Sequence, residues 1–188
     1  IERPTKSAQA VPDTRGQIIG RVSIDGRSFI VDEKARLGDW EADTVIGKGH
    51  KGVLVTLAER VSKKTPIAQV QSKHADVVKV AIIKLVGPEK EYLHTTTFDN
   101  GKEFAYHAQI KKALGTDNYF AHPYHSWERG LTENHNGLIP QYLPKAMALD
   151  KVTDEDIILI QNRLNNRPRK LLDYKTPNEV YEAMRLAA

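Results

Sequence analysis

The strongest constraint on the fold is a change of hydrophobic period near residue 72. Before that point the chain contains three extended runs, at 40–46 (WEADTVI), 53–59 (VLVTLAE) and 66–71 (PIAQVQ). Three consecutive runs of this kind, separated by short turns, favour an antiparallel meander of strands. Over residues 75–86 the period becomes helical, because Val78, Ala81, Ile82 and Leu85 lie on one face.

The pattern continues as a second alternation of strand and helix. We predict a strand at 95–98, a helix at 103–114 that Gly115 ends, and a strand at 118–121. Thr153 and Thr176 are predicted to cap two later helices, and Pro177 and Glu179 complete a capping-box pattern after Thr176. The order βββαβαβ predicts an α/β fold.

The first 35 residues differ from this core. Residues 1–15 are polar and contain two prolines, which is typical of a linker from a longer parent chain. Residues 16–35 alternate apolar and polar side chains around Asp25-Gly26, which favours a β-ribbon. We therefore expect a linker at 1–15, a ribbon at 16–35 and a core at 36–188.

Composition limits the class of site. The chain has no cysteine, so a metal ion would need carboxylate or imidazole ligands. Its net charge of +4 favours a polyanionic partner. No apolar run approaches the ~20 residues of a membrane span. We expect no membrane partner, and the absence of cysteine fits a location in the cytoplasm.

Two aspartates stand out on this map. Asp43 lies within a largely apolar strand, where a charge is costly unless it is paired or binds a metal ion. Asp99 follows the fourth strand, although Asp-Asn-Gly is also common turn chemistry. If the fourth strand is parallel to the first and beside it, the two carboxylates lie side by side in a crevice of the sheet. They would repel each other unless a cation lay between them.

A third acid is harder to choose from the residues alone. Glu133 would lie in the first turn of a helix that Thr132 caps, but an isolated glutamate there is usually solvated. Glu128, one residue after Trp127, is an alternative on composition.

Three motifs carry a family resemblance: WEADTVIGKGHKG, TFDNGKEF and PYHSWERGLTENHNG. They resemble the motifs of the DDE insertion-sequence transposases in the family numbered thirty, which share the catalytic core of retroviral integrases. The 33 residues between Asp99 and Glu133 are similar to the spacing in that superfamily. The resemblance continues through NRPRKLLDYKTPNEV and covers residues 36–182.

The resemblance implies a ribonuclease H-like (integrase core) fold, with a five-stranded mixed sheet flanked by helices. It implies that Asp43, Asp99 and Glu133 are the catalytic and metal-binding acids, and that Glu41, Glu103 and Glu128 are bystanders. Two Mg²⁺ or Mn²⁺ ions would be the cofactors. The implied reaction is cleavage of element ends and transfer of a 3′-hydroxyl into target DNA, by a homo-oligomer at the nucleoid.

Basic and polar residues near these motifs, and near the C-terminus, are candidates for DNA contact. They are Lys48, Lys51, Asn100, Lys102, Arg129, Arg163, Arg167, Arg169 and Lys170.

Some features leave alternatives open. Gly137 and Pro140 weaken the helix that would carry Glu133, and Ala42 stands where the family usually has glycine. The chain is alternatively a catalytically weakened DNA-binding remnant of a transposase, or a ribonuclease H-like nuclease that acts on RNA–DNA hybrids. His122, His125 and His135 are alternative metal ligands, although imidazole suits Zn²⁺ better than Mg²⁺.

Overall fold

The structure is a computed structural model, and it describes residues 18–47, 49, 51–123, 125, 128, 131, 136–142 and 149–187. The expected linker at 1–15 lies outside these residues. No helix in the described ranges is long and apolar enough to cross a membrane.

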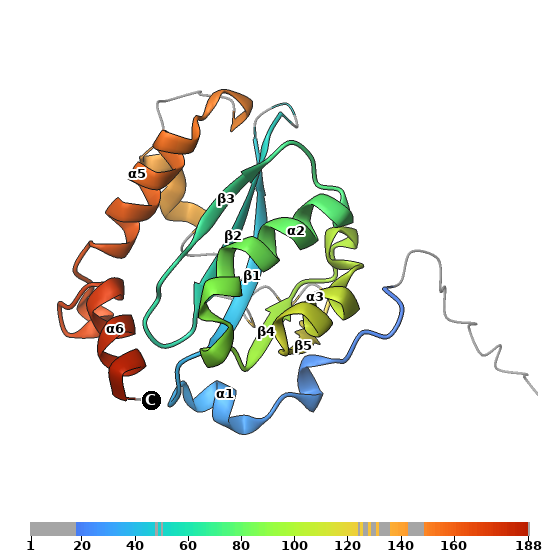
Figure 1. The fold of residues 1–188 in the computed structure, drawn as a ribbon, viewed down its shortest axis with the longest axis horizontal. Coiled ribbons are helices and arrows are strands. Elements are labelled where there is room, and N and C mark those ends of the chain that lie inside the picture. The colour runs from blue at the N-terminus through green and yellow to red at the C-terminus, as the bar shows by residue number, and fades with distance from the viewer. Residues whose placement is uncertain are drawn as a thin grey trace, which may run out of the picture.

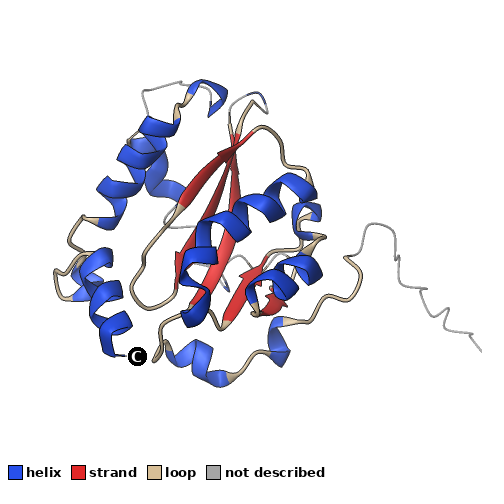
Figure 2. Cartoon of the chain, viewed as in Figure 1, coloured by secondary structure: helices blue, strands red, loops and turns tan. Residues whose placement is uncertain are grey.

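A five-stranded mixed sheet forms the centre of the molecule (Figures 1 and 2). The strands are β1 (Asp39–Ile46), β2 (Val53–Glu59), β3 (Ile67–Val70), β4 (Thr95–Phe98) and β5 (Asp117–Phe120), in the spatial order β3-β2-β1-β4-β5. The first three strands are antiparallel, and β4 is parallel to both β1 and β5. Both the predicted meander and the predicted parallel placement of the fourth strand are confirmed.

Helices cover both faces of this sheet. The main ones are α2 (Ala75–Val86), α3 (His107–Leu114), α5 (Asp154–Asn165) and α6 (Pro177–Ala187). Side chains in β2 alternate between two buried clusters, as the period of two requires. Val55 and Leu57 pack in the cluster that contains Ile82 of α2, whereas Leu54 packs with Ile160 of α5. The sheet therefore separates an α2 side from an α5 side (Figure 1).

The helix boundaries follow the predicted local signals. Thr153 caps α5 with a complete capping box, because its hydroxyl accepts from Asp156 N and the Asp156 carboxylate accepts from Thr153 N. The helix predicted at 103–114 is interrupted: Lys102–Phe104 form a 3-10 turn, and α3 begins only at His107. It ends at Gly115, which has a positive φ of 76°.

The β-ribbon predicted at 16–35 is wrong for the residues described. Ile24–Gly26 form a 3-10 turn and Phe29–Glu33 form the short helix α1. Strand pairing here is limited to an isolated bridge between Ser23 and Phe120. The physical reason is local, since the Ser23 hydroxyl accepts from Asp25 N and so favours a turn over a hairpin.

Candidate active site

Asp43 lies on β1, the central strand of the sheet, and is half-buried. It is paired across the antiparallel ladder with Thr56, next to Leu54 and on the α5 side. Its Oδ1 accepts a hydrogen bond of 2.8 Å from the backbone N–H of Thr44. The carboxylate is therefore held at the face of the sheet on which Val45 packs with the α5 cluster.

Asp99 is the first residue after β4. The parallel register pairs Glu41 with Thr97, and Asp43 and Asp99 each follow that pair by two residues. The β1–β4 ladder ends at Glu41 and Thr97, and its register extended by two residues would set Asp43 opposite Asp99 on one face. Asp99 Oδ1 accepts from Gly101 N at 2.8 Å, so the exit turn also fixes this carboxylate.

Asn136 connects the strands to a helical stretch over residues 136–138. Its Nδ2 donates to Asp43 Oδ2 at 2.9 Å, and its Oδ1 accepts from the Thr56 hydroxyl at 2.9 Å. The amide therefore orients Asp43 from the opposite side to Thr44. Asn136 and Thr56 are not among the residues predicted from the sequence. The available signal was the three-residue spacing between Glu133 and Asn136, which places two residues of a helix on one face.

Glu133 itself lies outside the described residues, so its predicted role stays a prediction. Pro140, however, falls in a described 3-10 turn, Ile139–Gln141, directly after the helical residues 136–138. It occupies the start of that turn, a position that does not need its missing N–H. The proline therefore does not disrupt Asn136, because the regular helix has already ended.

The three expected bystander acids each contact a basic side chain. The contacts are Glu41 with Arg60 at 2.6 Å, Glu103 with Lys73 at 2.7 Å, and Glu128 with His122 at 2.9 Å. Asp43 and Asp99 accept hydrogen bonds from backbone N–H groups and, for Asp43, from the Asn136 amide. The assignment of Glu41, Glu103 and Glu128 as bystanders stays a prediction.

The two aspartates fit a site for a hard divalent cation. Their oxygens are the donor type that Mg²⁺ and Mn²⁺ prefer. A carboxylate oxygen has two lone pairs, so a hydrogen bond and a metal ion can share it. Within the described ranges, no group of three His, Asp or Glu side chains that could hold a metal ion is found. The expected third acid lies outside those ranges.

The histidines predicted as alternative ligands have other contacts. His122 Nδ1 lies 2.9 Å from Glu128 Oε1, and its Nε2 lies 2.9 Å from Asp25 Oδ2. Hydrogen bonds to Glu128 and Asp25 raise the pKa of His122 above its ordinary value. His125 stacks edge-on against His122, whereas His135 lies outside the described residues. The pair therefore joins Asp25 in the N-terminal segment to the loop after β5.

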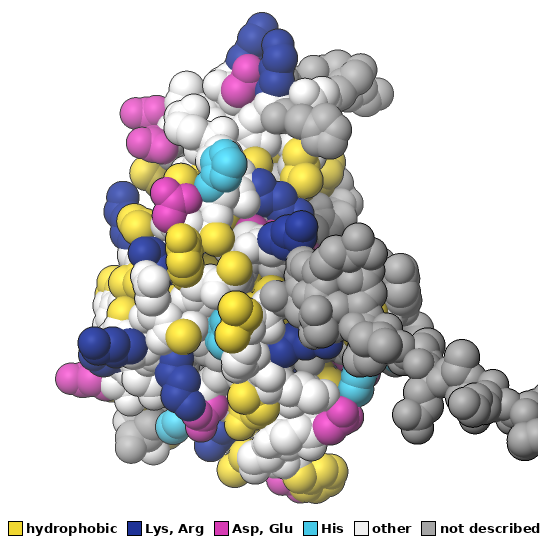
Figure 3. Space-filling model, turned by 90° about the vertical axis from the view of Figure 1, so that its right-hand side faces the viewer, with side chains coloured by type: hydrophobic (Ala, Val, Ile, Leu, Met, Phe, Trp, Pro, Cys, Tyr) yellow, Lys and Arg dark blue, Asp and Glu magenta, His cyan; other side chains and the backbone are white. Residues whose placement is uncertain are grey.

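The candidate DNA-contact residues differ in their surroundings. Lys48 and Arg129 lie outside the described residues. Lys51, Lys102, Arg163, Arg167 and Lys170 are exposed, whereas Arg169 is half-buried. Asn100 instead supports the exit turn, because it accepts from Arg21 and donates to Ala121 O. Figure 3 shows basic and acidic side chains interspersed on the face it views, so the net positive charge is not gathered there.

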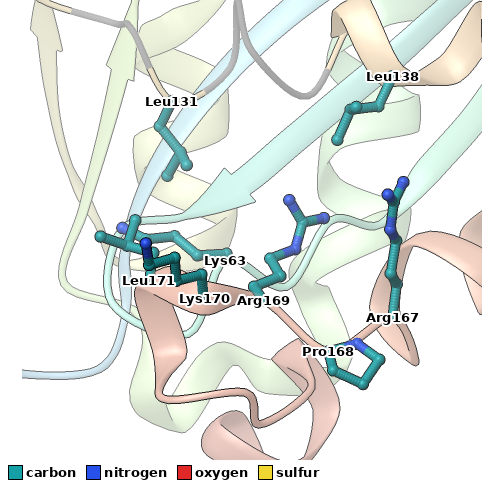
Figure 4. A pocket seen from close by; sticks show the side chains of 8 residues that line it. All are labelled: Lys63, Leu131, Leu138, Arg167, Pro168, Arg169, Lys170 and Leu171. Carbon is teal, nitrogen blue, oxygen red and sulfur yellow. The ribbon is translucent and has the colours of Figure 1, made fainter.

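Positive charge does gather beside the loop between α5 and α6, which is called the C-terminal loop below. Arg167, Arg169 and Lys170 line a cavity of about 340 Å³ together with Lys63, from the turn between β2 and β3 (Figure 4). Lys63 was missed in the sequence, since nothing local indicates that a lysine in a hairpin turn lies against a loop 100 residues later. Burial is the main cause that lowers its pKa from 10.5 to about 8.

The chain is similar to curated transposases. It is 50% identical over 169 residues to the transposase of insertion sequence IS4351 from Bacteroides fragilis. It is 37% identical to transposase InsI of IS30A from Escherichia coli, and 38% identical to the transposase of IS1086 from Cupriavidus metallidurans. These matches cover 88–89% of this chain but 43–52% of the relatives, so the chain spans about half their length. No family model matches.

Solved structures share the fold. The catalytic core domain of BIV integrase matches with a TM-score of 0.61 at 20% identity, covering 79% of this chain and 96% of that one. A simian T-cell lymphotropic virus intasome matches with a TM-score of 0.67 at 16% identity, covering 80% of this chain and 56% of that one. The chain thus has the ribonuclease H-like fold of retroviral integrase cores, and it is a homologue of the IS30-family insertion-sequence transposases.

Proposed function

We propose that this chain is the catalytic domain of a DNA transposase, which breaks and rejoins phosphodiester bonds. Its catalytic acids would be Asp43, Asp99 and Glu133. The main structural support is the parallel register of β1 and β4, which, extended by two residues, would set Asp43 opposite Asp99. The transposase relatives supply the reaction class. The family resemblance supplies Glu133.

The three carboxylates would hold two Mg²⁺ or Mn²⁺ ions. Bound there, the ions would lower the pKa of an attacking hydroxyl and stabilise the leaving oxygen. Backbone N–H groups and one side-chain amide orient the two aspartates. Asn136 and the Thr44 N–H bind opposite oxygens of Asp43, and the Gly101 N–H binds Asp99. Such orientation matters because small misplacements of reacting groups cost large factors in rate.

Two reactions share this site. In the first, water attacks a phosphorus atom at the element end, and the bond from phosphorus to the 3′ oxygen breaks. In the second, the freed 3′-hydroxyl attacks a phosphorus atom of target DNA, and the target's own 3′ oxygen leaves with the proton. Each step forms one P–O bond and breaks one. Neither step requires a covalent protein intermediate.

The proposed partners are element ends and target DNA, at the nucleoid in the bacterial cytoplasm. The contact residues proposed are Lys48, Lys51, Asn100, Lys102, Arg129, Arg163, Arg167, Arg169 and Lys170. Synapsis of two DNA ends requires at least two copies of the catalytic domain, so we propose a homo-oligomer in the DNA complex.

Point variants test the assignment of the acids. Asp43→Asn and Glu133→Gln should abolish Mg²⁺-dependent joining of a labelled 3′-hydroxyl oligonucleotide to a plasmid, while Glu128→Gln should keep it. Calorimetry with Mn²⁺ gives a readout that does not depend on turnover, and Asp43→Asn should lose that binding. Retained joining by either acid variant would refute the assignment.

Assays of the wild-type protein distinguish the transposase from the two alternatives, a ribonuclease H-like nuclease and a DNA-binding remnant. Hydrolysis of RNA–DNA hybrids without joining would favour the nuclease. DNA binding without metal-dependent chemistry would favour the remnant.

A further inference from the structure

The cavity beside the C-terminal loop has an unusual lining. Among the residues that the structure describes, four ionisable side chains line it, Lys63, Arg167, Arg169 and Lys170, and all are basic. The other described lining residues are apolar and include Leu131 and Leu138. In Figure 4 the guanidinium groups of Arg167 and Arg169 point toward the side on which these leucines lie. Four cations and an apolar wall thus surround about 340 Å³ of space.

Lys63 is held in this cavity by its own turn. Its side chain is buried, its backbone is left-handed with a φ of 67°, and its Nζ donates to Arg60 O. A lysine adopts this φ only where surrounding contacts enforce it. Burial first, and then Lys34, lower its pKa, while Glu59 and Glu41 oppose the shift. The turn therefore positions an incompletely neutralised ammonium group.

Arg169 is also incompletely satisfied. Its Nε is buried and makes no hydrogen bond within the described part of the chain, and its Nη2 donates to Leu164 O at 3.3 Å. Burial and the neighbouring Arg167 lower its pKa. A buried N–H of a charged group without an acceptor is costly, so an occupant that supplies oxygen atoms would be favoured.

We infer that this cavity binds a backbone phosphate of a DNA strand, with the adjoining sugar or base against the leucine wall. A guanidinium binds two phosphate oxygens at once, and a lysine adds a compact charge. The cavity volume lies within the range of small-molecule sites, which admits a nucleotide unit rather than a phosphate ion alone. The identification of the polyanion as DNA rests on the proposed function, whereas the phosphate chemistry rests on the lining.

The cavity also adjoins the proposed active site along the chain. Leu131 and Leu138 flank the segment that contains Glu133 and Asn136, and Asn136 binds Asp43. A strand bound in the cavity would therefore contact the segment that orients the carboxylate. This DNA contact is separate from the metal site, and it can be measured without metal.

The test uses binding of a fluorescent oligonucleotide in EDTA. Lys63→Met and Arg169→Gln should each weaken binding about tenfold and lower the slope of log K against log salt by about one. Lys84→Met removes one exposed positive charge from α2 and serves as the matched control, with a change of under about twofold expected. If all three variants bind alike, the proposal is wrong. DNA binding in EDTA requires no metal ion, whereas the Mn²⁺ calorimetry that tests the proposed function requires no DNA. Failure of this proposal is therefore distinguishable from failure of the proposed function.

Two further measurements control for misfolding of the variants and distinguish a DNA phosphate from free inorganic phosphate. Lys170→Met changes an exposed cation of the same cavity, so its loss of affinity does not depend on refolding a buried site. In the wild type, the NMR signal of the Lys63 side chain should shift with a short oligonucleotide at concentrations where inorganic phosphate gives no shift. An equal response to inorganic phosphate, or no response to the oligonucleotide, would overturn DNA binding at this cavity.

Discussion

Asn136 is the residue on which the geometry of the candidate site depends most directly. One amide joins Asp43 on β1 to Thr56 on β2, across 93 and 80 positions of sequence respectively. Because it contacts a proposed metal ligand rather than the substrate, we regard it as a positioning residue. Partners of metal ligands typically contribute factors of about 10–100 in metal affinity or activity.

Asn136→Ala should therefore lower Mn²⁺ affinity and DNA joining about 10- to 100-fold. The expected loss of stability is about 2–4 kcal/mol, since one hydrogen bond to the charged Asp43 carboxylate and one neutral bond to Thr56 are removed. Calorimetry and chemical denaturation separate the two effects. Thr56→Val removes the hydrogen bond from the Thr56 hydroxyl to Asn136 Oδ1. It should lower Mn²⁺ affinity less than Asn136→Ala does. Unchanged affinity in Asn136→Ala would mean that the amide is merely structural.

Lys63 should leave a signature in the pH dependence of stability. Its pKa is lowered to about 8 in the folded chain but would be 10.5 without the fold. Between these values the unfolded chain binds more protons, so the free energy of unfolding rises from about pH 8 to pH 10.5. The charged groups that act on Lys63 are Lys34, Glu41, Glu59 and Arg60.

Lys63→Met should remove this rise and, at pH 7, increase the free energy of unfolding by roughly 1–3 kcal/mol. Urea denaturation of wild type and variant at pH 7, 9 and 10 measures the difference. Parallel pH profiles for the two proteins would show that the lysine is not destabilised by its surroundings.

At the scale of elements, two glycines differ in whether their position can accept a side chain. Gly137 is exposed and helical, and an added Cβ would meet nothing within 4 Å. Gly52, in the loop between β1 and β2, has a φ of 73°, and an added Cβ would lie 2.4 Å from Asp150 N. Only Gly52 is needed for its conformation and for close approach of the loop to Leu149 and Asp150.

Gly137→Ala should therefore raise the free energy of unfolding by about 0.5–1 kcal/mol, through helix propensity and a less flexible unfolded chain. Gly52→Ala should lower it by at least about 1 kcal/mol because of the left-handed backbone and the overlap. Thermal denaturation of both variants provides the comparison. Destabilisation by Gly137→Ala would indicate that this position is not a regular helix.

The elements that sequence could predict are those set by local periodicity. The strand at 53–59 and the helix at 75–86 match β2 and α2 in full, because alternation and a 3.6-residue period are properties of short windows. The prediction of a β-ribbon at 16–35 was wrong. Asp25-Gly26 indicates a turn, but it does not indicate which segments pair on either side of that turn. Ser23 bonds locally and bridges to Phe120 instead.

The site shows the same division. The parallel placement of β4 beside β1 was predictable, because strand order determines which strands are neighbours. The roles of Asp43 and Asp99, which depend on that placement, stay predictions. Lys63 was not predictable, and the only sequence signal for Asn136 was its three-residue spacing from Glu133. Their roles arise from contacts with segments about 100 residues away, and neither residue type is unusual in its local sequence. Periodicity indicates which elements form, whereas such contacts depend on how those elements pack.

At the scale of the whole molecule, the sheet has different tasks on its two faces. One face packs against α2 and α3 in a cluster that includes Trp40, Phe98 and Phe104. The other carries Asp43 and Thr56 beside the smaller cluster around α5. β1 and β4 each contribute to both faces of the sheet. A change in charge at Asp43 or Asp99 should therefore change the free energy of unfolding of the whole domain.

Metal binding should therefore appear in global unfolding. A cation that binds only the folded chain stabilises it by about 2.7 kcal/mol at 100 times its dissociation constant. For a domain of this size that corresponds to a rise in Tm of about 5–10 °C. Wild type should show this rise with Mn²⁺, and Glu128→Gln should retain it. Asp43→Asn should lose the rise and, without metal, melt at or above the wild-type temperature, because one of two adjacent like charges is gone. An equal Mn²⁺ response in Asp43→Asn would mean that the cation binds elsewhere, and the assignment of this edge as the metal site would fail.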